Sequence, residues 1–460
     1  MRLNSKLPLF LAMAFYVASA LAQKATPRDQ FFWLGEINKA SAVINTDEGL
    51  LDKAKAPTIA AAGRSSQDMF ATYRAAIMRD NLLNLADQLN QASESLVKLA
   101  DEHAQTIVPN YTNGVAAQPN SLGHALLGHA AGFERDAQRI RQAYARIDRS
   151  PMGTSVLNGS SWPLNRLRMA EYLGFAAIVD NAYDAAQISS SEYPVEVAGI
   201  VTSVGLHVGH FIQDVLAQYG QTRPWILLQA RGMNTRVSSA MPQKQNPILL
   251  TETRRDVSTA LALAMGPVMR AHNITPGMQD PKEESSNTEM VQSAVQFLKS
   301  FERILNALVI SPERALEELN SDWTASQELA DVLMSKYKVP FRVGHHFAAE
   351  LVKHGKANNI KPLDFPYAGA KKIFLESVKE YSATLALPMS EQEFRSTLNP
   401  VAIVQNRRTV GGPQMSEMKR MLALAKQQLA DQNQWINARR RAIENARTKL
   451  DKDFSKLLTP

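Results

Sequence analysis

The amino-acid sequence predicts an all-α protein built around a bundle of long helices. Three stretches lack both glycine and proline, the residues that most often end helices: residues 64–108, 283–310 and 414–459. In the first stretch, apolar residues recur at helical spacing from Met69 to Leu99. No segment shows a convincing strand-like alternation. Because long helices bury their apolar faces only against equally long partners, we expect a bundle.

The same pattern predicts the remaining helices. Further helical stretches are expected at residues 124–149, 195–219 and 248–265. Ser311-Pro312 and Val339-Pro340 mark turns after the central helices. The tail that follows residue 413 is polar and basic, with three arginines in one turn at residues 439–441. We interpret this triplet as a solvated helix face, and a patch for an anionic surface is the alternative.

Composition excludes several kinds of chemistry. The chain has 460 residues and no cysteine, so thiol catalysis, thiolate-bound zinc, iron–sulfur clusters and disulfides are excluded. The formal charge of +7, from 51 Lys+Arg and 44 Asp+Glu, is spread over the length and does not predict nucleic-acid binding. The length predicts two or three domains around a sizeable core.

The first 22 residues are predicted to be a cleavable secretory signal. Arg2 and Lys6 precede an apolar run at residues 7–18, and Ala20-Leu21-Ala22 offers small residues where a signal peptidase cuts. The alternative is an N-terminal membrane anchor, but that run is shorter than the roughly 20 residues a spanning helix needs. No later stretch is expected to cross a membrane. The mature protein is therefore expected to be periplasmic or secreted.

One loop carries an unusual concentration of polar groups. Residues 238–247 read Ser-Ser-Ala-Met-Pro-Gln-Lys-Gln-Asn-Pro, with two prolines that interrupt otherwise helical sequence. The loop offers two hydroxyls, one cation and the amide of Asn246 within ten residues. A lysine neutralises a carboxylate while serine and asparagine hydrogen-bond its oxygens. The loop therefore predicts a site for an anionic substrate.

This loop resembles the signature of the fumarase/aspartase superfamily, and its core resembles that of argininosuccinate lyase in particular. Other segments resemble the same family in the same order: residues 63–68, 109–119, 150–175, 278–283, 339–342 and 398–412. The chain is identified as a member of this superfamily from residue 63 to residue 413.

The resemblance implies a three-domain, all-α fold with a long central helical bundle. We expect the signal peptide at 1–22, a short N-terminal domain at 23–66, the central bundle at 67–318 and a C-terminal helical domain at 319–460. Family members are homotetramers in which three subunits contribute to each active site. They catalyse β-elimination that releases fumarate, and the lyase branch uses N-substituted aspartates. No cofactor, metal or nucleic acid is implied.

Residue roles follow from the same resemblance. Ser238 matches the catalytic base, and Lys244 matches a residue that stabilises the carboxylate of the carbanion intermediate. A serine is a poor base unless its alkoxide is stabilised, which a nearby lysine or helix N-terminus provides. The matched substrate-binding positions are Ser66, Gln67, Thr112, Asn113, Ser239, Asn246, Gln279 and Lys282. Capping a helix or satisfying backbone groups is the alternative for Thr112 and Gln279, and a surface lysine is the alternative for Lys282.

The departures from the family pattern cluster in the expected pocket. Asn113 stands where the family has a histidine that moves a proton near the leaving group, and a neutral amide cannot do this. Val237 replaces a glycine, Ser66 replaces an arginine that meets the substrate, and Ile274 replaces a tyrosine. His124 is a candidate replacement proton donor. Argininosuccinate itself is therefore not the expected physiological substrate.

Three functions remain open from the sequence. The first is a carbon–nitrogen lyase that releases fumarate from an argininosuccinate-like N-substituted aspartate or related dicarboxylate. The second is a relative of carboxymuconate cycloisomerase, a branch that also lacks the histidine. The third is a catalytically inactive, secreted binding protein on the same scaffold. His207 and His210 lie three apart on an expected helix, and a structural or surface role is favoured over metal ligation.

Overall fold

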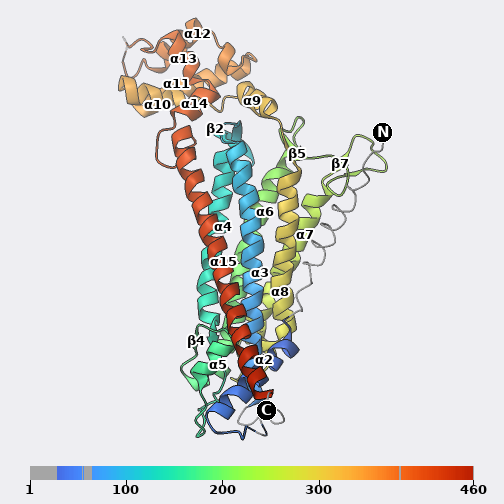
Figure 1. Cartoon of the computed structure of the whole chain (residues 1–460). Coiled ribbons are helices and arrows are strands. Elements are labelled where there is room, and N and C mark those ends of the chain that lie inside the picture. The colour runs from blue at the N-terminus through green and yellow to red at the C-terminus, as the bar shows by residue number, and fades with distance from the viewer. Residues whose placement is uncertain (1–27, 54, 56–64, 383–384, 459–460) are drawn as a thin grey trace, which may run out of the picture. The chain divides into compact units, whose positions relative to one another are not determined.

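The computed structural model describes residues 28–53, 55, 65–382 and 385–458 (Figure 1). The expected signal segment, residues 1–22, lies outside them. Helices dominate the described chain, and the strands form four two-stranded pairs. The predicted all-α class is thus confirmed. The predicted domain limits at residues 22, 66 and 318 stay a prediction.

The described chain divides into two compact units. The first contains the residues up to Ile77, residues 149–186 and the residues from Ile443 onward. The second contains residues 78–148 and 187–442. Two long helices contribute to both units: α3 (Ser66–Glu102) and α15 (Met415–Leu458).

Long helices build the second unit. Besides the parts of α3 and α15 that belong to it, they are α4 (Leu122–Ile147), α6 (Ser189–Gln218), α7 (Ile248–Ala271) and α8 (Glu284–Ala307). Helix α6 packs against α4, α7 and α8. Phe301 contacts Phe133 and Phe211 edge to face, with ring centroids 5.5 and 5.2 Å apart. Such pairs of rings stabilise a core beyond their buried area.

Helix α7 is longer than the sequence predicted. The expected end at Met265 is wrong, because the helix continues through Gly266 and Pro267 to Ala271. Proline removes one main-chain hydrogen bond from a helix. The helix continues because its buried face packs against α6 and α8, and tertiary packing outweighs local propensity.

Helix α6 also corrects an expectation about membranes. By length and composition α6, together with the residues just before it, could cross a membrane, so the expectation that no later stretch qualifies was wrong. Half of its apolar window is buried within the protein, however. Its partners in the second unit give it the environment of a core helix.

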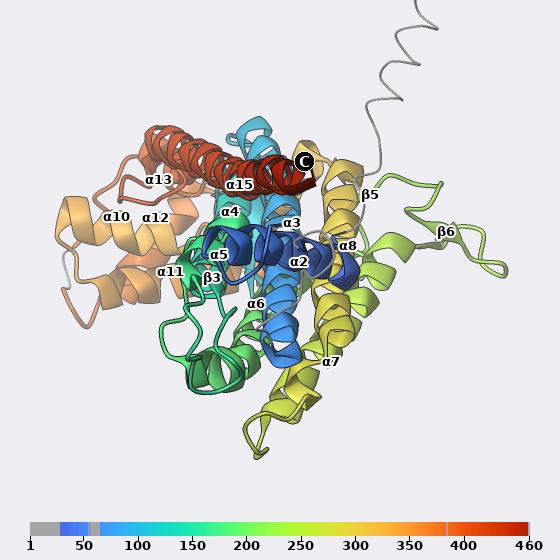
Figure 2. The same ribbon diagram turned by 60° about the horizontal axis from the view of Figure 1, so that its bottom comes forward.

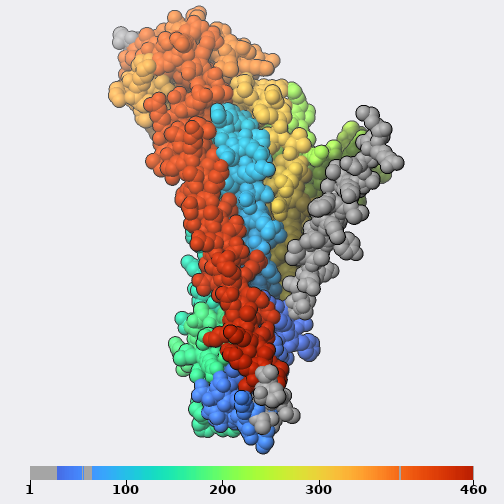
Figure 3. All heavy atoms as spheres, in the orientation of Figure 1, coloured from blue at the N-terminus to red at the C-terminus, as the bar shows by residue number. Residues whose placement is uncertain are grey.

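Helix α15 lies along α3 in the second unit, and Figure 3 shows the red atoms of α15 beside the light-blue atoms of α3. Lys426 pairs with Asp101 at 2.7 Å, and Arg440 pairs with Asp87 at 3.2 Å. Arg440 is partly exposed as well as paired, so the prediction of a solvated face at residues 439–441 holds in part for this residue. It holds for Arg441, which is exposed.

A series of short helices follows α8 in the second unit. They are α9 (Pro312–Ser321), α10 (Gln327–Tyr337), α11 (Phe341–Ala357), η3 (Pro362–Asp364), α12 (Tyr367–Ser377), α13 (Glu391–Thr397) and α14 (Pro400–Asn406). Phe347, Phe374 and Phe394 are fully buried among them. The predicted turns are confirmed, since Pro312 begins α9 and Pro340 precedes α11.

The described residues also form eight short strands that the sequence did not predict. In the second unit they form three antiparallel pairs: β1 (Ile107–Thr112) with β2 (Val115–Ser121), β5 (Ile226–Leu228) with β8 (Leu308–Ile310), and β6 (Arg236–Val237) with β7 (Gln245–Asn246). The first unit holds the parallel pair of β3 (Arg149–Ser150) and β4 (Ala177–Ile178). Strands of two or three residues are too short to give a periodic signal.

The first unit contains α2 (Gln30–Asp47) and α5 (Arg166–Tyr172), which Figure 2 shows in dark blue and green. The π-helix η1 (Asp184–Ile188) leads out of this unit into α6. Asp68, in the first turn of α3, is 1% exposed. Its carboxylate accepts hydrogen bonds of 2.8–2.9 Å from Thr154, Ser155 and Val156. This carboxylate fixes the loop that follows β3.

Candidate active site

Four of the predicted site residues lie on one hairpin of the second unit. Strands β6 and β7 pair through Arg236 with Asn246 and Val237 with Gln245. The backbone N–H of Ser238 donates to the carbonyl of Lys244 at 2.9 Å, which closes the loop between the strands. Figures 1 and 2 both show this hairpin extending away from the helices. The structure therefore brings Ser238 and Lys244 together through their main chains.

The hydroxyl of Ser238 sits in a small cradle of main-chain amides. Its Oγ accepts hydrogen bonds from the N–H groups of Ala240 at 3.3 Å and Met241 at 3.2 Å. Hydrogen bonds to the charged form of a group favour that form. Two amide donors therefore stabilise a serine alkoxide, the state in which serine acts as a base. The sequence predicted a lysine or a helix N-terminus for this task and did not foresee the two amides.

The other polar side chains of the hairpin differ in how free they are to contact a substrate. Lys244 and Ser239 are exposed, and Lys244 makes no ion pair with any residue that the structure describes. Asn246 donates from Nδ2 to the carbonyl of Arg236 at 3.1 Å, so part of its amide holds the hairpin. Val237 occupies strand β6, where a β-branched residue is favoured. The replacement of the family's glycine by Val237 therefore suits the strand that it occupies.

Thr112 and Asn113 lie on a second hairpin. Thr112 ends β1 and pairs with Val115, so Asn113 and Gly114 form a two-residue turn. Their φ angles are +53° and +77°, as a type I′ turn requires. Thr112 ends a strand, so the helix-capping part of its alternative is wrong. The Asn113-Gly114 pair is itself a hairpin signal that the sequence analysis overlooked.

Tyr111 anchors this hairpin, a role that the sequence did not predict. Its hydroxyl donates to Glu318 at 2.6 Å and accepts from Nε1 of Trp225 at 3.0 Å. Burial and the hydrogen bond to Glu318 raise the pKa of Tyr111 to about 12. Tyr111 is thus a neutral donor at ordinary pH, and it fixes the strand that presents Thr112. Only tertiary contacts identify it.

Gln279 and Lys282 lie at the turn between α7 and α8. Lys282 belongs to the short helix η2 (Asp280–Lys282) and is 1% exposed, so the surface-lysine alternative is wrong. Gln279 is exposed and its side chain makes no cap hydrogen bond in that helix, so the helix-capping part of its alternative is wrong. Glu283 caps α8 instead. Although burial raises its pKa, hydrogen bonds from Ser285 and Ser286 hold the pKa of Glu283 at about 2.

One chain does not bring all the predicted residues together. Helix α7 begins two residues after Asn246 and ends eight residues before Gln279, and its 24 residues span about 36 Å. The hairpin of Ser238 and the turn of Lys282 therefore lie at opposite ends of α7. Ser66 and Gln67 begin α3 within the first unit, Ser66 exposed and Gln67 partly buried.

Two of the three histidines singled out from the sequence, His124 and His207, have hydrogen-bond partners, and His210 is exposed. His207 lies 2.6 Å, through Nδ1, from the fully buried carboxylate of Asp136. This contact confirms the favoured structural role for His207. Nε2 of His124 donates to the carbonyl of Gly411 at 2.8 Å. No group of three His, Asp or Glu residues within the described ranges is arranged to hold a metal ion.

Comparisons with known proteins identify the family of the chain. Residues 38–259 match a family of lyases, and residues 323–405 match the argininosuccinate lyase C-terminal family. Argininosuccinate lyase of Geobacillus thermodenitrificans is 30% identical over 376 residues, which cover 80% of this chain and 76% of that protein. The enzyme of Methanosarcina acetivorans is 28% identical over 393 residues, covering 84% and 76% of the two chains.

Solved structures share the fold. The crystal structure of EDDS lyase in complex with formate matches with a TM-score of 0.83 and 20% identity, covering 93% of this chain and 92% of that one. The 3-carboxy-cis,cis-muconate lactonizing enzyme of Pseudomonas putida matches with a TM-score of 0.63 and 17% identity, covering 90% and 98%. The family match and the relatives of 30% identity place the chain among the lyases. The chain belongs to the argininosuccinate lyase-like members of the fumarase/aspartase superfamily.

Proposed function

We propose that the protein is a carbon–nitrogen lyase that cleaves an N-substituted aspartate or related dicarboxylate and releases fumarate. The observation that carries this proposal is the cradle at Ser238, where two main-chain amides point at the hydroxyl oxygen. The exposed ammonium of Lys244 on the same hairpin supplies the charge that a carboxylate substrate needs. Relatives named argininosuccinate lyase support the reaction class.

In this proposal Ser238, as its alkoxide, removes a proton from the carbon next to the substrate carboxylate. The electron pair of that C–H bond delocalises into the carboxylate, which becomes a dianion beside Lys244. The pair then forms the C=C bond of fumarate as the C–N bond breaks. The electrons of the broken C–N bond stay on the nitrogen of the leaving amine, which takes up a proton. Lys244 contributes to rate because the charge that it stabilises exists only near the transition state.

We further propose that the working protein is a homotetramer whose sites draw residues from several chains. Two observations support this. The span of about 36 Å along α7 separates the two predicted parts of the site in one chain. On the same helix Met265 and Met269 are 57% and 71% exposed, and exposed apolar clusters mark interaction surfaces.

We propose a periplasmic or secreted location, because the first 22 residues have the composition of a cleavable signal. Three possible N-glycosylation sites, including Asn110-Tyr111-Thr112, lie in or beside the expected pocket walls. Sugars there would block the site, which favours a bacterial periplasm over a eukaryotic secretory route. Arginine biosynthesis does not need a secreted enzyme, so a different N-substituted aspartate is the proposed substrate.

The test is a panel of N-substituted aspartates and dicarboxylates on the mature protein, with fumarate formation followed by absorbance and binding by thermal shift. A true substrate releases fumarate, and Ser238→Ala lowers kcat about 10²- to 10⁴-fold. Ser258→Ala is the matched control, since that hydroxyl is exposed on α7 and bonds to its own helix. Binding without turnover would favour the non-catalytic protein. Ring closure of a carboxymuconate would favour the cycloisomerase, and silence across the panel would reject all three.

A further inference from the structure

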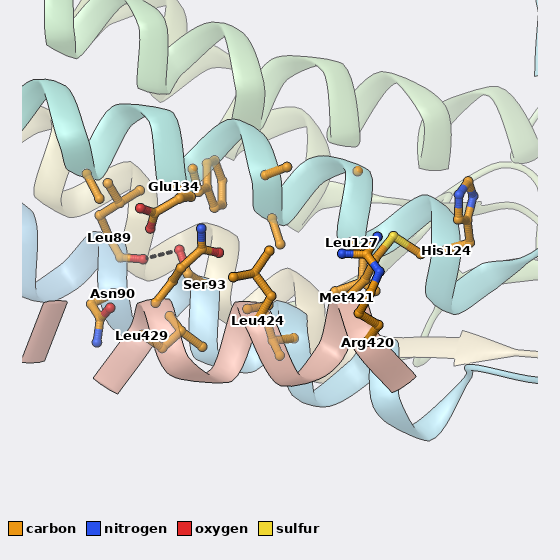
Figure 4. Close-up of a pocket in the computed structure, with 18 residues that line it drawn as sticks. Leu89, Asn90, Ser93, His124, Leu127, Glu134, Arg420, Met421, Leu424 and Leu429 are labelled. Carbon is orange, nitrogen blue, oxygen red and sulfur yellow. Dashed lines mark hydrogen bonds between the residues drawn. The ribbon is translucent and has the colours of Figure 1, made fainter. Parts of the chain in front are cut away.

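A cavity of about 320 Å³ lies between α3, α4 and α15 in the second unit (Figure 4). We call this cavity the α15 groove. Apolar side chains form most of it, among them Val97, Leu127 and Leu424. Of the residues that the sequence analysis named for the dicarboxylate site, His124, the candidate proton donor, lines the groove, and the predicted substrate-binding residues do not. The groove is otherwise a separate feature of the bundle.

The polar groups of the α15 groove collect at its two ends. Figure 4 shows Glu134, Asn90 and Ser93 toward one end and His124 and Arg420 toward the other. Glu134 and His124 are ten residues apart on α4, which corresponds to about 15 Å along the helix. A molecule that fills the groove therefore meets polar groups at both ends and apolar side chains between them.

The cationic end is already neutralised by the protein. Arg420 forms a 2.8 Å ion pair with Glu417, and that carboxylate also accepts the N–H of Gly411 at 2.8 Å. His124 donates from Nε2 to the carbonyl of Gly411. This end thus has little unbalanced charge to offer an anionic ligand.

The acidic end is not neutralised. The partly buried Glu134 accepts one neutral hydrogen bond, from Gln138 at 3.0 Å, and forms no ion pair among the described residues. Ser93 donates its hydroxyl hydrogen to the carbonyl of Leu89 at 2.7 Å, so the lone pairs of its oxygen remain available. Asn90, one turn earlier on α3, is 4% exposed and lines the same groove. Removing a carboxylate from water without a cation is unfavourable.

We propose that the α15 groove is a binding site for an amphipathic primary amine. The ammonium group donates hydrogens to the carboxylate of Glu134 and to Ser93 Oγ. The apolar chain runs along α4 toward His124. A methylene group occupies about 30 Å³, roughly the volume of one water molecule in the liquid. The groove therefore has room for a chain of about ten heavy atoms. This site is independent of the proposed lyase activity.

The test is calorimetric titration of the full mature protein with n-octylammonium. 1-Octanol and octanoate, which have the same chain length, serve as comparison ligands. We expect one octylammonium per chain, at least tenfold weaker binding of octanol and no binding of octanoate. The tenfold figure is the lower end expected for a charge-assisted hydrogen bond. Octanoate binding as tightly as octylammonium would place the head group at Arg420 and overturn the proposal.

Two variants locate the site. Glu134→Gln keeps the shape of the side chain, and we expect it to weaken octylammonium binding at least tenfold while leaving octanol unchanged. Gly128 lines the groove with open space where a Cβ would stand, so Gly128→Phe fills the groove and abolishes binding. Gly199 on α6 has equally open space away from the groove, and Gly199→Phe is the matched control. Unchanged octylammonium binding in either groove variant would refute the proposed site. If Gly128→Phe does not fold, the comparison of Glu134→Gln with the parent protein decides whether the site exists.

Discussion

Ser238 and Lys282 lie at opposite ends of α7, separated along the helix by about 36 Å. Both residues are predicted to contact the same small substrate. Within a single chain they lie too far apart to do so. Mixing Ser238→Ala and Lys282→Met chains before refolding should therefore restore part of the fumarate-releasing activity, because hybrid assemblies contain sites with neither substitution. Each variant alone should be inactive. No recovery in a mixed assembly whose hybrid nature is verified by native mass spectrometry would exclude a shared site.

Asp68 should be among the most sensitive positions for stability. Its buried carboxylate accepts hydrogen bonds from three successive residues after β3. Asp68→Ala leaves those donors unsatisfied and should cost about 3 kcal/mol of unfolding free energy, as for the loss of several buried hydrogen bonds. Urea unfolding measures this loss. Asp52→Ala, an exposed aspartate of the same unit, is the control and should change stability little.

Val156 holds a backbone conformation that β-branched residues avoid, with φ of +81°. Glycine adopts such angles without strain, so Val156→Gly should stabilise the protein or leave it unchanged, whereas valine-to-glycine changes elsewhere usually destabilise. Thermal unfolding checks the sign. A clear loss of stability would mean that packing of the Val156 side chain outweighs its backbone strain.

Asn113 should behave as a turn residue. At its positive φ, asparagine and glycine are favoured over histidine. Asn113→Gly should keep the melting temperature within a degree or two, and Asn113→His should lower stability by about 0.5–1 kcal/mol. If Asn113→His also raises kcat and introduces a pH dependence near neutrality, the missing histidine limits the chemistry. An unchanged pH profile would point to another proton donor.

Glu283 should make stability depend on acid pH. Its folded pKa, about 2, lies below the ordinary value of 4.5, so its contribution is fully present above pH 4.5 and is lost as pH falls toward 2. Glu283→Gln should therefore be less stable than the parent at pH 7 and equally stable near pH 2. Urea unfolding at pH 7, 4 and 2.5 tests this. A constant difference between the two proteins would show that the side chain contributes through shape, not charge.

Two glycines of α4 should respond oppositely to alanine. A Cβ at Gly123 would lie 2.4 Å from the carbonyl oxygen of Ala100, whereas a Cβ at Gly128 meets nothing within 4 Å. Gly123→Ala should cost more than 2 kcal/mol through this clash, and Gly128→Ala should gain about 0.5–1 kcal/mol from helix propensity. Chemical denaturation of both variants makes the comparison. Equal effects would mean that α3 and α4 can shift apart.

Much of the helical architecture could be predicted from the sequence. The glycine- and proline-free stretches became α3, α8 and α15, and the predicted turns became helix starts at Pro312 and after Pro340. Strands of two or three residues could not be predicted, because they are fixed by pairing between distant segments, as in β5 with β8. The hairpin at Asn113-Gly114 was the exception, since its turn residues carry a local signal.

The sequence by itself determined the fold class and the loop of Ser238 and Lys244, because helix periodicity and a short polar motif are local properties of the chain. Only the tertiary structure revealed the amide cradle around Ser238 Oγ, the anchoring of the Thr112 hairpin by Tyr111 and the burial of Lys282. It also separated the predicted site residues along α7. Burial, hydrogen-bond partners and distances between helix ends depend on how distant segments pack, which no local pattern records.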